Sequence, residues 1–234
     1  MTIKNTAGDG AIRGQAISVY ADADICRFEN VKITGCQDTL FCAPLPLKER
    51  QKNGFVGPRE FSPRKKTKQY YKNCEIHGDV DFIFGGADAV FDDCLIQCNN
   101  RETKAKERAE GRFINGYVTA ASGLKDDLGF VFRNCTVKGE TGCAPGSVFL
   151  GRPWREEAKT VYLNCKMDDT ISPERFSGWK GIDAPEPLAT YGEYGTVNQD
   201  GQPVSMDGRN SWVQEIDGQT YSEIMKKADE ICNL

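Results

Sequence analysis

Two aspartates in this 234-residue chain occupy matching places in a repeated pattern. Asp38 lies ten positions after the aromatic residue Phe28, and Asp81 lies ten positions after Tyr71. If successive copies of the pattern stack in register, the two carboxyl groups lie side by side. One ionised and one protonated carboxyl group can serve as nucleophile and acid when their surroundings separate their pKa values.

Other catalytic arrangements find little support. The chain has a single histidine, His77, and no GxSxG motif accompanies it, so a Ser-His-Asp or Cys-His hydrolase is not indicated. The position of His77 directly after a repeat copy predicts a turn residue rather than a base. Arg152, within the sequence LGRPW, offers a guanidinium fork that can hold a carboxylate ionised and oriented. Taken alone, each of these motifs is equally compatible with a polar turn.

A weak internal repeat of the form aromatic-x-Asn-Cys-x-aliphatic positions these residues. Copies or variants begin at Phe28, Tyr71, Phe91, Phe132 and Tyr162, and the chain opens on a further copy at Ile3. The 20 to 43 residues from one start to the next predict coils of roughly 20 to 25 residues, some of them doubled or lengthened by loops. Because Asn tolerates the left-handed backbone region that turns a strand sharply, we expect Asn to stack above Asn.

Cysteine follows the repeat asparagine or its replacement in four copies. These residues are Cys74, Cys94, Cys135 and Cys165. We interpret them as an inward ladder of small apolar side chains rather than as ligands or bridges. The chain has ten cysteines but no CxxC pair or Cys/His cluster, and it is long enough to bury a core without disulfides. We expect no metal ion and no cofactor.

These features predict an all-β chain folded as a single-stranded right-handed parallel β-helix. In such a solenoid the backbone hydrogen bonds run from coil to coil, and long loops emerge on one side. We expect loops over residues 42–69 and 99–112, and a short C-terminal helix over 221–231 as the only helix. Residues 1–234 are expected to form one domain.

Composition excludes several classes of partner. The formal net charge of -4 gives no electrostatic reason to bind nucleic acid. We interpret the strongest basic run, residues 64–68, as a solvated loop, the alternative being a patch that steers an acidic polymer. No segment approaches the roughly 20 apolar residues that span a bilayer, and the start of the chain does not have the pattern of a signal peptide. We expect a monomer without membrane contact.

Four segments resemble, in sequence order, the signature segments of pectin methylesterases. They are GQA at 14–16, GCQDTL at 35–40, DFIFG at 81–85 and LGRPW at 150–154, and weaker agreement at 116–120, 178–179 and 191–194 extends the resemblance over nearly the whole chain. The resemblance implies a pectin-lyase-like solenoid that hydrolyses C6 methyl esters of polygalacturonate, the methyl-esterified homogalacturonan of pectin, to carboxylates and methanol. Because this polymer belongs to the cell wall, the resemblance also implies a secreted or cell-surface protein.

The resemblance assigns roles residue by residue. Asp81 corresponds to the nucleophile that forms an acyl-enzyme, Asp38 to the general acid and then base, and Arg152 to the residue that orients the nucleophile. Gln15 and Gln37 correspond to the donors of an oxyanion hole. The aromatic positions that line the substrate groove correspond to Phe41, Phe84, Phe149, Trp154 and Trp179. For Phe84, a place in the core is an equal alternative.

The chain departs from the family pattern in two ways, and other functions stay open. It lacks the family's N-terminal coils, so it is expected to be a truncated form, and the segment 42–69 lengthens the interval between the two aspartates. A pectin-active lyase would need a Ca²⁺ carboxylate cluster, and an inverting polygalacturonase would need carboxyl groups about 6.5–9.5 Å apart. A non-catalytic polygalacturonate-binding β-helix, disabled by truncation, is the alternative from another class.

Overall fold

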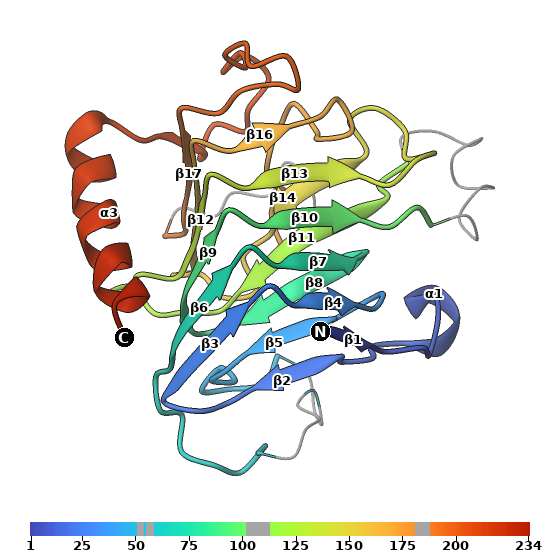
Figure 1. Cartoon of the computed structure of the whole chain (residues 1–234), viewed down its shortest axis with the longest axis vertical. Helices are drawn as coiled ribbons and strands as arrows, with labels where there is room; N and C mark the ends of the chain where they lie inside the picture. Colours follow the sequence, from blue (N-terminus) through green and yellow to red (C-terminus); the bar gives the residue numbers. More distant parts are fainter. Residues whose placement is uncertain (51–53, 55–58, 102–112, 181–187) are drawn as a thin grey trace.

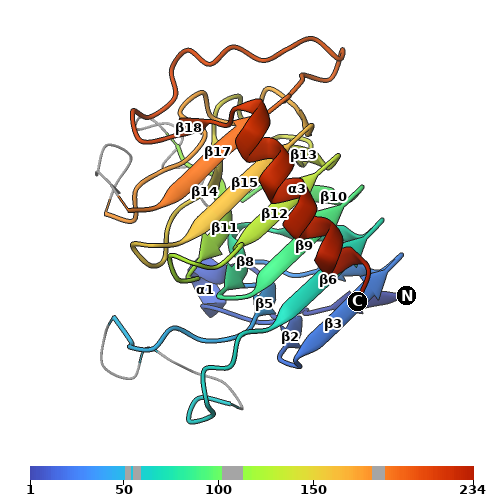
Figure 2. The same cartoon turned by 90° about the vertical axis from the view of Figure 1, so that its left-hand side faces the viewer.

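The computed structural model describes residues 1–50, 54, 59–101, 113–180 and 188–234. Within these residues the strands form three sheets, A, B and C, whose strand pairs are parallel (Figures 1 and 2). Sheet A contains, in spatial order, β1 (Thr2–Lys4), β4 (Lys32–Thr34), β7 (Glu75–Gly78), β10 (Leu95–Cys98), β13 (Thr136–Gly139) and β16 (Lys166–Met167). Sheet B contains β2 (Val19–Ala21), β5 (Leu40–Cys42), β8 (Val80–Gly85), β11 (Gly116–Ala121) and β14 (Val148–Gly151). Sheet C contains β3 (Ile25–Glu29), β6 (Lys68–Lys72), β9 (Asp88–Asp92), β12 (Phe130–Arg133), β15 (Lys159–Leu163), β17 (Thr190–Tyr194) and β18 (Gln214–Glu215).

From β1 to β16 consecutive strands visit the three sheets in turn, so each of these coils adds one strand to each sheet, whereas β17 and β18 both join sheet C. The coil of β3, β4 and β5 is followed by the coil of β6, β7 and β8, and each strand pairs with its counterpart one coil away. The predicted all-β parallel β-helix is therefore confirmed. Successive repeat copies from β3 to β15 pair directly with one another, so their unequal spacing comes from loops and none of these coils is doubled.

The aromatic residue of each repeat copy stacks on the next inside the solenoid. The rings of Phe28, Tyr71, Phe91, Phe132 and Tyr162 form this ladder, with centroid separations of 4.5–5.0 Å and interplanar angles of 3–9°. Parallel pairing places identical repeat positions directly above one another, which brings ring over ring. Offset aromatic pairs add to the stabilisation from burial alone, so this ladder is a central part of the core.

The repeat asparagines adopt the backbone conformation that their residue type predicts. Asn30, Asn73, Asn134 and Asn164 have φ between 51° and 54°, in the left-handed region. The Asn73 side-chain amide donates to Asn30 Oδ1 at 2.6 Å, which confirms stacking of asparagine on asparagine for this pair. The copy expected at Ile3 is wrong, because Ile3 pairs with Ile33 and so occupies the aliphatic position of the repeat rather than the aromatic one.

The cysteine ladder is also confirmed. Cys74, Cys94, Cys135 and Cys165 are buried with unoxidised thiols. Each thiol lies against a backbone carbonyl group of its own coil and of the neighbouring coil, as Cys135 does with Arg133 O and Phe91 O at 3.4 and 3.3 Å. The thiols therefore act as small core side chains whose weak donors are satisfied.

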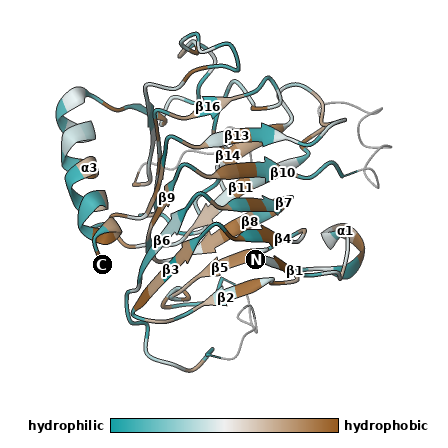
Figure 3. Cartoon of the chain, in the orientation of Figure 1, coloured by the Kyte–Doolittle hydropathy of each residue, from teal (hydrophilic) through white to brown (hydrophobic). Residues whose placement is uncertain are grey.

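Helix α3 (Gly218–Cys232) covers the outer face of sheet C, as Figure 2 shows. The sequence predicts this helix over 221–231. The prediction is confirmed, although the observed helix begins three residues earlier and ends one residue later. Asp217 caps its N-terminus, accepting from Thr220 N–H at 2.7 Å. Ala228 and Ile231 pack on sheet C together with the partly buried Ile224 and Met225, and much of the remaining helix surface is hydrophilic or neutral (Figure 3).

Three further sequence expectations concern loops and short elements. A one-turn helix, α1 (Gly10–Arg13), adds to the single helix expected. The described residues of the segment 43–67 form a loop that ends where β6 begins, while residues 51–53 and 55–58 of it, and most of the loop expected over 99–112, lie outside the described residues. His77 was expected in a turn but lies inside β7, because the inward Ile76 before it and the buried Gly78 after it continue the strand alternation. Neither α1 nor α3 is long and apolar enough to cross a membrane.

Truncating the centre of the aromatic ladder should destabilise the protein strongly. Phe91→Ala removes a fully buried ring that stacks on two neighbours, so we expect a loss of about 3–5 kcal/mol in the free energy of unfolding. Phe61→Ala is the matched control because Phe61 is 93% exposed, and it should change stability by less than about 0.5 kcal/mol. Urea denaturation followed by far-UV circular dichroism measures both; equal losses would contradict the importance of the ladder.

Candidate active site

Asp38 and Asp81 lie in register on adjacent coils of sheet B. Leu40 pairs with Ile83, two residues beyond each aspartate, and Asp38 N–H donates to Val80 O at 3.1 Å. Both aspartates have left-handed backbones, with φ of 60° and 50°. The structure therefore places the two carboxyl-bearing residues one above the other, as the ten-residue spacing predicts.

An irregularity in β8 directs Asp81 out of the solenoid. Three steps along β8, from Val80 to Ile83, match only two steps along β11, from Tyr117 to Thr119, so β8 carries one extra residue there. Bulges of this kind bend a strand and re-aim a side chain. Phe82 and Ile83 both enter the main core, whereas Asp81 leaves it and reaches the outer face of sheet B.

Glycines keep the neighbouring backbones close to this site. Gly85 ends the DFIFG segment with φ of 123°, and a Cβ atom on it would lie 2.0 Å from Cys42 O. Gly151 precedes Arg152, and a Cβ atom there would lie 1.9 Å from Thr119 Oγ1. Only glycine allows this approach. Arg152 N–H then donates to Thr119 O at 2.9 Å, which fixes on β11 the start of the loop over residues 152–158, called the arginine loop below.

Arg152 holds Asp81 through a two-pronged ion pair. Its Nε donates to Asp81 Oδ1 at 2.9 Å and its Nη2 to Asp81 Oδ2 at 2.7 Å. The guanidinium carbon also lies 4.1 Å from the ring centre of Tyr117 and 4.5 Å from that of Trp179. Bidentate pairing combined with two ring contacts fixes the orientation of both the arginine and the carboxylate.

The surroundings separate the two carboxyl groups in pKa. Burial, followed by the charge of Asp81, raises the pKa of Asp38 well above its usual range, and Arg152 opposes this only in part. Burial also raises the pKa of Asp81, but the bound Arg152 acts directly against it. Asp38 therefore holds its proton to higher pH than Asp81 does, which suits one acid and one ionised nucleophile.

Gln15 and Gln37 lie beside the aspartates in sequence and near each other in space. Ala16 N–H, next to Gln15, donates to Gln37 O at 3.1 Å, so the two glutamines sit on adjacent coils. Gln15 is exposed, and the Gln37 side chain lies against Gly10 of α1. Within the described part of the chain neither side-chain amide has a hydrogen-bond partner, which leaves both able to donate to a ligand.

The five aromatic residues expected at the groove divide into two groups. Trp154 and Trp179 are partly exposed beside a cluster on the outer face of sheet B that includes Phe41 and Phe84. Phe41, Phe84 and Phe149 are buried, and Phe149 stacks on Tyr117 with no exposed surface. Phe84 therefore takes the core place that was its equal alternative. These three rings offer little surface to a ligand, whereas the two tryptophans remain accessible.

Sequence reasoning missed two residues of this site. Tyr117 provides a ring under Arg152, and Asp79 contributes to the raised pKa of Asp38 through its charge. The segment around Tyr117 was noted only for weak agreement with the family. The pairing of β11 with β8 shows why Tyr117 belongs to the site: it follows the buried Gly116, so its side chain points to the same outer face as Asp81.

The fold and the site together define a parallel β-helix protein with an Asp–Asp–Arg constellation on the outer face of one sheet. A family model described as Pectinesterase matches residues 64–228, and the chain belongs to this family. The probable pectinesterase/pectinesterase inhibitor 64 of Arabidopsis thaliana is 33% identical over 226 residues, which cover 92% of this chain and 32% of that protein. Probable pectinesterase 8 of the same plant is 35% identical over 167 residues, covering 70% of this chain and 39% of that protein.

Solved structures agree with the observed fold. The pectin methylesterase from carrot superposes with a TM-score of 0.71 and 26% identity, covering 95% of this chain and 60% of that chain. The pectin methylesterase from Aspergillus niger gives a TM-score of 0.64 and 26% identity, covering 93% and 58%. The chain thus spans 32–39% of the length of the first curated relatives and about three fifths of these solved chains.

Removing the arginine of the ion pair should destabilise the folded protein. Arg152→Ala leaves the carboxylate of Asp81 buried without its cation, and we expect a loss of about 3–5 kcal/mol at pH 7. The double variant Arg152→Ala/Asp81→Asn removes both charges and should recover much of this loss. Urea denaturation of the two variants and the parent measures the effect; a double variant no more stable than Arg152→Ala would contradict it.

Proposed function

We propose that this chain is a pectin methylesterase that hydrolyses C6 methyl esters of polygalacturonate through an acyl-enzyme on Asp81. The observation that carries the proposal is the bidentate pairing of Asp81 with Arg152 directly beside the more strongly protonated Asp38. Membership of the pectinesterase family supports the same chemistry. A carboxylic ester hydrolase needs a nucleophile, an acid for the leaving group and donors for the oxyanion.

In the first half of the proposed cycle, a carboxylate oxygen of Asp81 attacks the ester carbonyl carbon. The bond to the methoxy group breaks, and Asp38 gives its proton to the departing oxygen to form methanol. Gln15 and Gln37 donate to the oxyanion, a role that their unengaged amides allow. Asp81 is then joined to the sugar as an acyl-enzyme.

In the second half, water attacks the acyl carbon while Asp38, now ionised, takes a proton from it. The bond to Asp81 breaks, which regenerates its carboxylate and releases a galacturonate carboxyl group. Arg152 holds the regenerated carboxylate in the same orientation for the next attack. Trp154 and Trp179 offer partly exposed rings on which apolar faces of the sugar can stack.

Replacing the nucleophile should abolish methanol release from highly methylated pectin. Asp81→Asn is the preferred variant because Asn tolerates the left-handed backbone at this position, and activity should fall more than about 10³-fold. Asp93→Asn is the matched control, since Asp93 has nearly the same φ but lies exposed on a different sheet boundary. A soluble, folded parent that releases no methanol would favour the polygalacturonate-binding alternative.

The proposed roles also predict a bell-shaped dependence of kcat/KM on pH. Activity rises as Asp81 loses its proton and falls as Asp38 loses the proton needed by methanol, with the falling limb well above the usual carboxyl range because the pKa of Asp38 is raised by burial. Asp38→Asn removes the titrating acid, so kcat/KM should drop about 10²–10⁴-fold and the falling limb should disappear. An unchanged alkaline limb in this variant would assign that limb to another group.

A further inference from the structure

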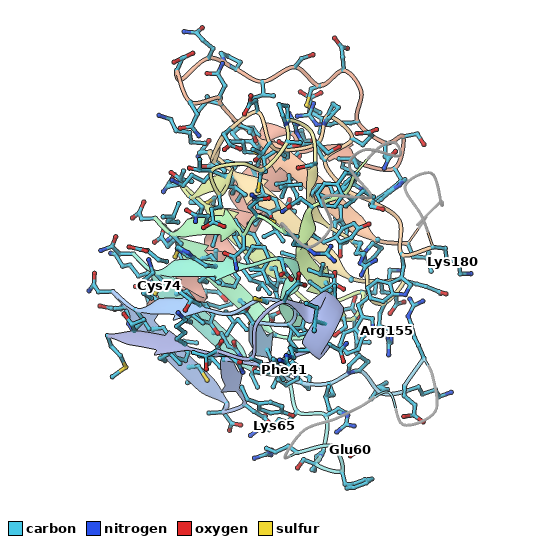
Figure 4. The ribbon with its side chains drawn as sticks, turned by 90° about the vertical axis from the view of Figure 1, so that its right-hand side faces the viewer. Phe41, Glu60, Lys65, Cys74, Arg155 and Lys180 are labelled. Atoms are coloured by element: carbon cyan, nitrogen blue, oxygen red, sulfur yellow. The ribbon has the colours of Figure 1, made fainter. Side chains whose placement is uncertain are left out.

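A pocket of about 630 Å³ opens among the loops that follow β5, β11 and β14, a size typical of small-molecule sites. It is lined by the first part of the long loop after β5, by residues that follow β11 and by the end of the arginine loop after β14. Figure 4 shows Arg155, one of its lining residues, on the same side of the molecule as Phe41 and away from Cys74. The mechanism proposed above makes no use of this pocket.

Two arginines of the pocket converge on a single backbone oxygen. Arg50 Nε donates to Trp154 O at 2.8 Å, and Arg155 Nη1 donates to the same oxygen at 2.7 Å. Arg155 Nη2 also donates to Lys48 O at 2.6 Å, which holds the long loop against the arginine loop. The two guanidinium groups are thus held close together although they carry the same charge.

No carboxylate of the described residues neutralises this pair. Glu49 and Glu157 line the same pocket but accept from backbone N–H groups of Gly54 and Lys125. Arg50 and Arg155 make ion pairs with neither of these acids nor with any other described residue. The proximity has an electrostatic cost, because burial and the charge of Arg50 lower the pKa of Arg155 to about 10.

The neighbouring basic run does not share this property. Lys65 pairs with Asp24, and Lys66 pairs with both Asp88 and Asp127. Arg64 donates to the carbonyl oxygens of the loop that carries it. The segment 64–68 is therefore largely occupied by contacts within the protein, in contrast to the arginine pair.

Aromatic rings connect the arginine pair to the catalytic residues. Arg155 lies 4.7 Å from the ring centre of Trp154, and Arg50 lies 5.1 Å from that of Trp179. The same Trp179 ring contacts Arg152, which binds Asp81. A polymer that occupies the aspartates and the tryptophans would therefore reach Arg50 and Arg155 with a neighbouring sugar unit.

We propose that Arg50 and Arg155 form a subsite for the free carboxylate of a de-esterified galacturonate unit, next to the unit whose ester is cleaved. Two adjacent guanidinium groups supply several donors for one carboxylate, and a bound anion removes their mutual repulsion. The proposal rests on the esterase function above for its place in the reaction. It implies a preference for esters adjacent to units that are already free acids.

Calorimetric titration with unesterified trigalacturonate and with its fully methylated ester tests the subsite. An Asp38→Asn background slows turnover of the ester while keeping the pair of Asp81 and Arg152 intact, so that no new cation is exposed. In this background Arg50→Gln and Arg155→Gln should each weaken trigalacturonate binding about tenfold and leave binding of the methyl ester within about twofold.

Lys65→Gln and Arg155→Lys serve as controls. Lys65→Gln removes one charge from the same long loop outside the pocket and should leave both affinities unchanged. Arg155→Lys keeps the charge and should retain most of the affinity, which separates loss of charge from loss of loop structure. Equal affinity of the parent for the two ligands, or arginine variants that weaken both equally, would overturn the subsite.

Methanol release by the chain without substitutions is measured separately and distinguishes the two proposals. If trigalacturonate binds in an arginine-dependent way but no methanol is released, the esterase function fails and the carboxylate subsite stands. If methanol is released and the arginine variants bind trigalacturonate like the parent, the subsite fails and the esterase function stands.

Discussion

Parallel pairing from one coil to the next is the constraint on which the structure depends. Every residue in a paired segment lies directly above its counterpart one coil away. A register that stacks one pair of residues favourably therefore also fixes every other stacked pair along the same coil. The same register that stacks Tyr71 on Phe28 stacks Asp81 beside Asp38. Stacking rings stabilises the core, whereas bringing two buried carboxyl groups together is unfavourable when both are ionised. The fold therefore imposes the carboxyl pair through interactions made elsewhere in the coil.

Arg152 must reach across one coil to offset the unfavourable approach of the two buried carboxyl groups. Asp81 belongs to β8 and Arg152 follows β14, while β11 lies between these strands in sheet B. The guanidinium group spans this gap over the ring of Tyr117. The electron-rich face of the ring stabilises the cation, which would otherwise be partly desolvated without a favourable contact. Gly151 makes the span possible, since any side chain there would collide with Thr119. Sheet order thus contributes to the pKa difference between the aspartates, because Arg152 lowers the pKa of Asp81 through both its charge and its hydrogen bonds and that of Asp38 through its charge alone.

The sequence predicted the parts of the fold that recur with the same residue type at a fixed place. The cysteine ladder and the left-handed asparagines belong to this class, because each copy repeats both the residue and its physical reason. The stacking of the aromatic rings was not predicted, although the same repeat carries it. Ile3 was misplaced because an isolated copy without its aromatic residue can be aligned in two registers. His77 was misjudged because the strand alternation passes through it and β8 begins only three residues further on, at Val80. The candidate pair Asp38 and Asp81 was predictable for the same reason as the ladders, since both occupy one register position.

Contacts between loops could not be predicted from the repeat pattern of the sequence. Arg50 and Arg155 are separated by a long stretch of sequence and belong to no repeat position, so only the folded backbone brings both to Trp154 O. Their contrast with Arg152 is informative. Arg152 is a half-buried cation with a carboxylate partner, whereas Arg50 and Arg155 are held by carbonyl oxygens and ring faces, which do not cancel a positive charge. In the proposed reaction, a polyanionic substrate would bring negative charge to a site where Asp81 must stay ionised as the nucleophile and Asp38 is already hard to ionise. Arg50 and Arg155, which form no ion pair with a described residue, would offset that charge locally in the proposed subsite. A neighbouring free carboxylate could then bind without raising the pKa of Asp81 toward that of Asp38.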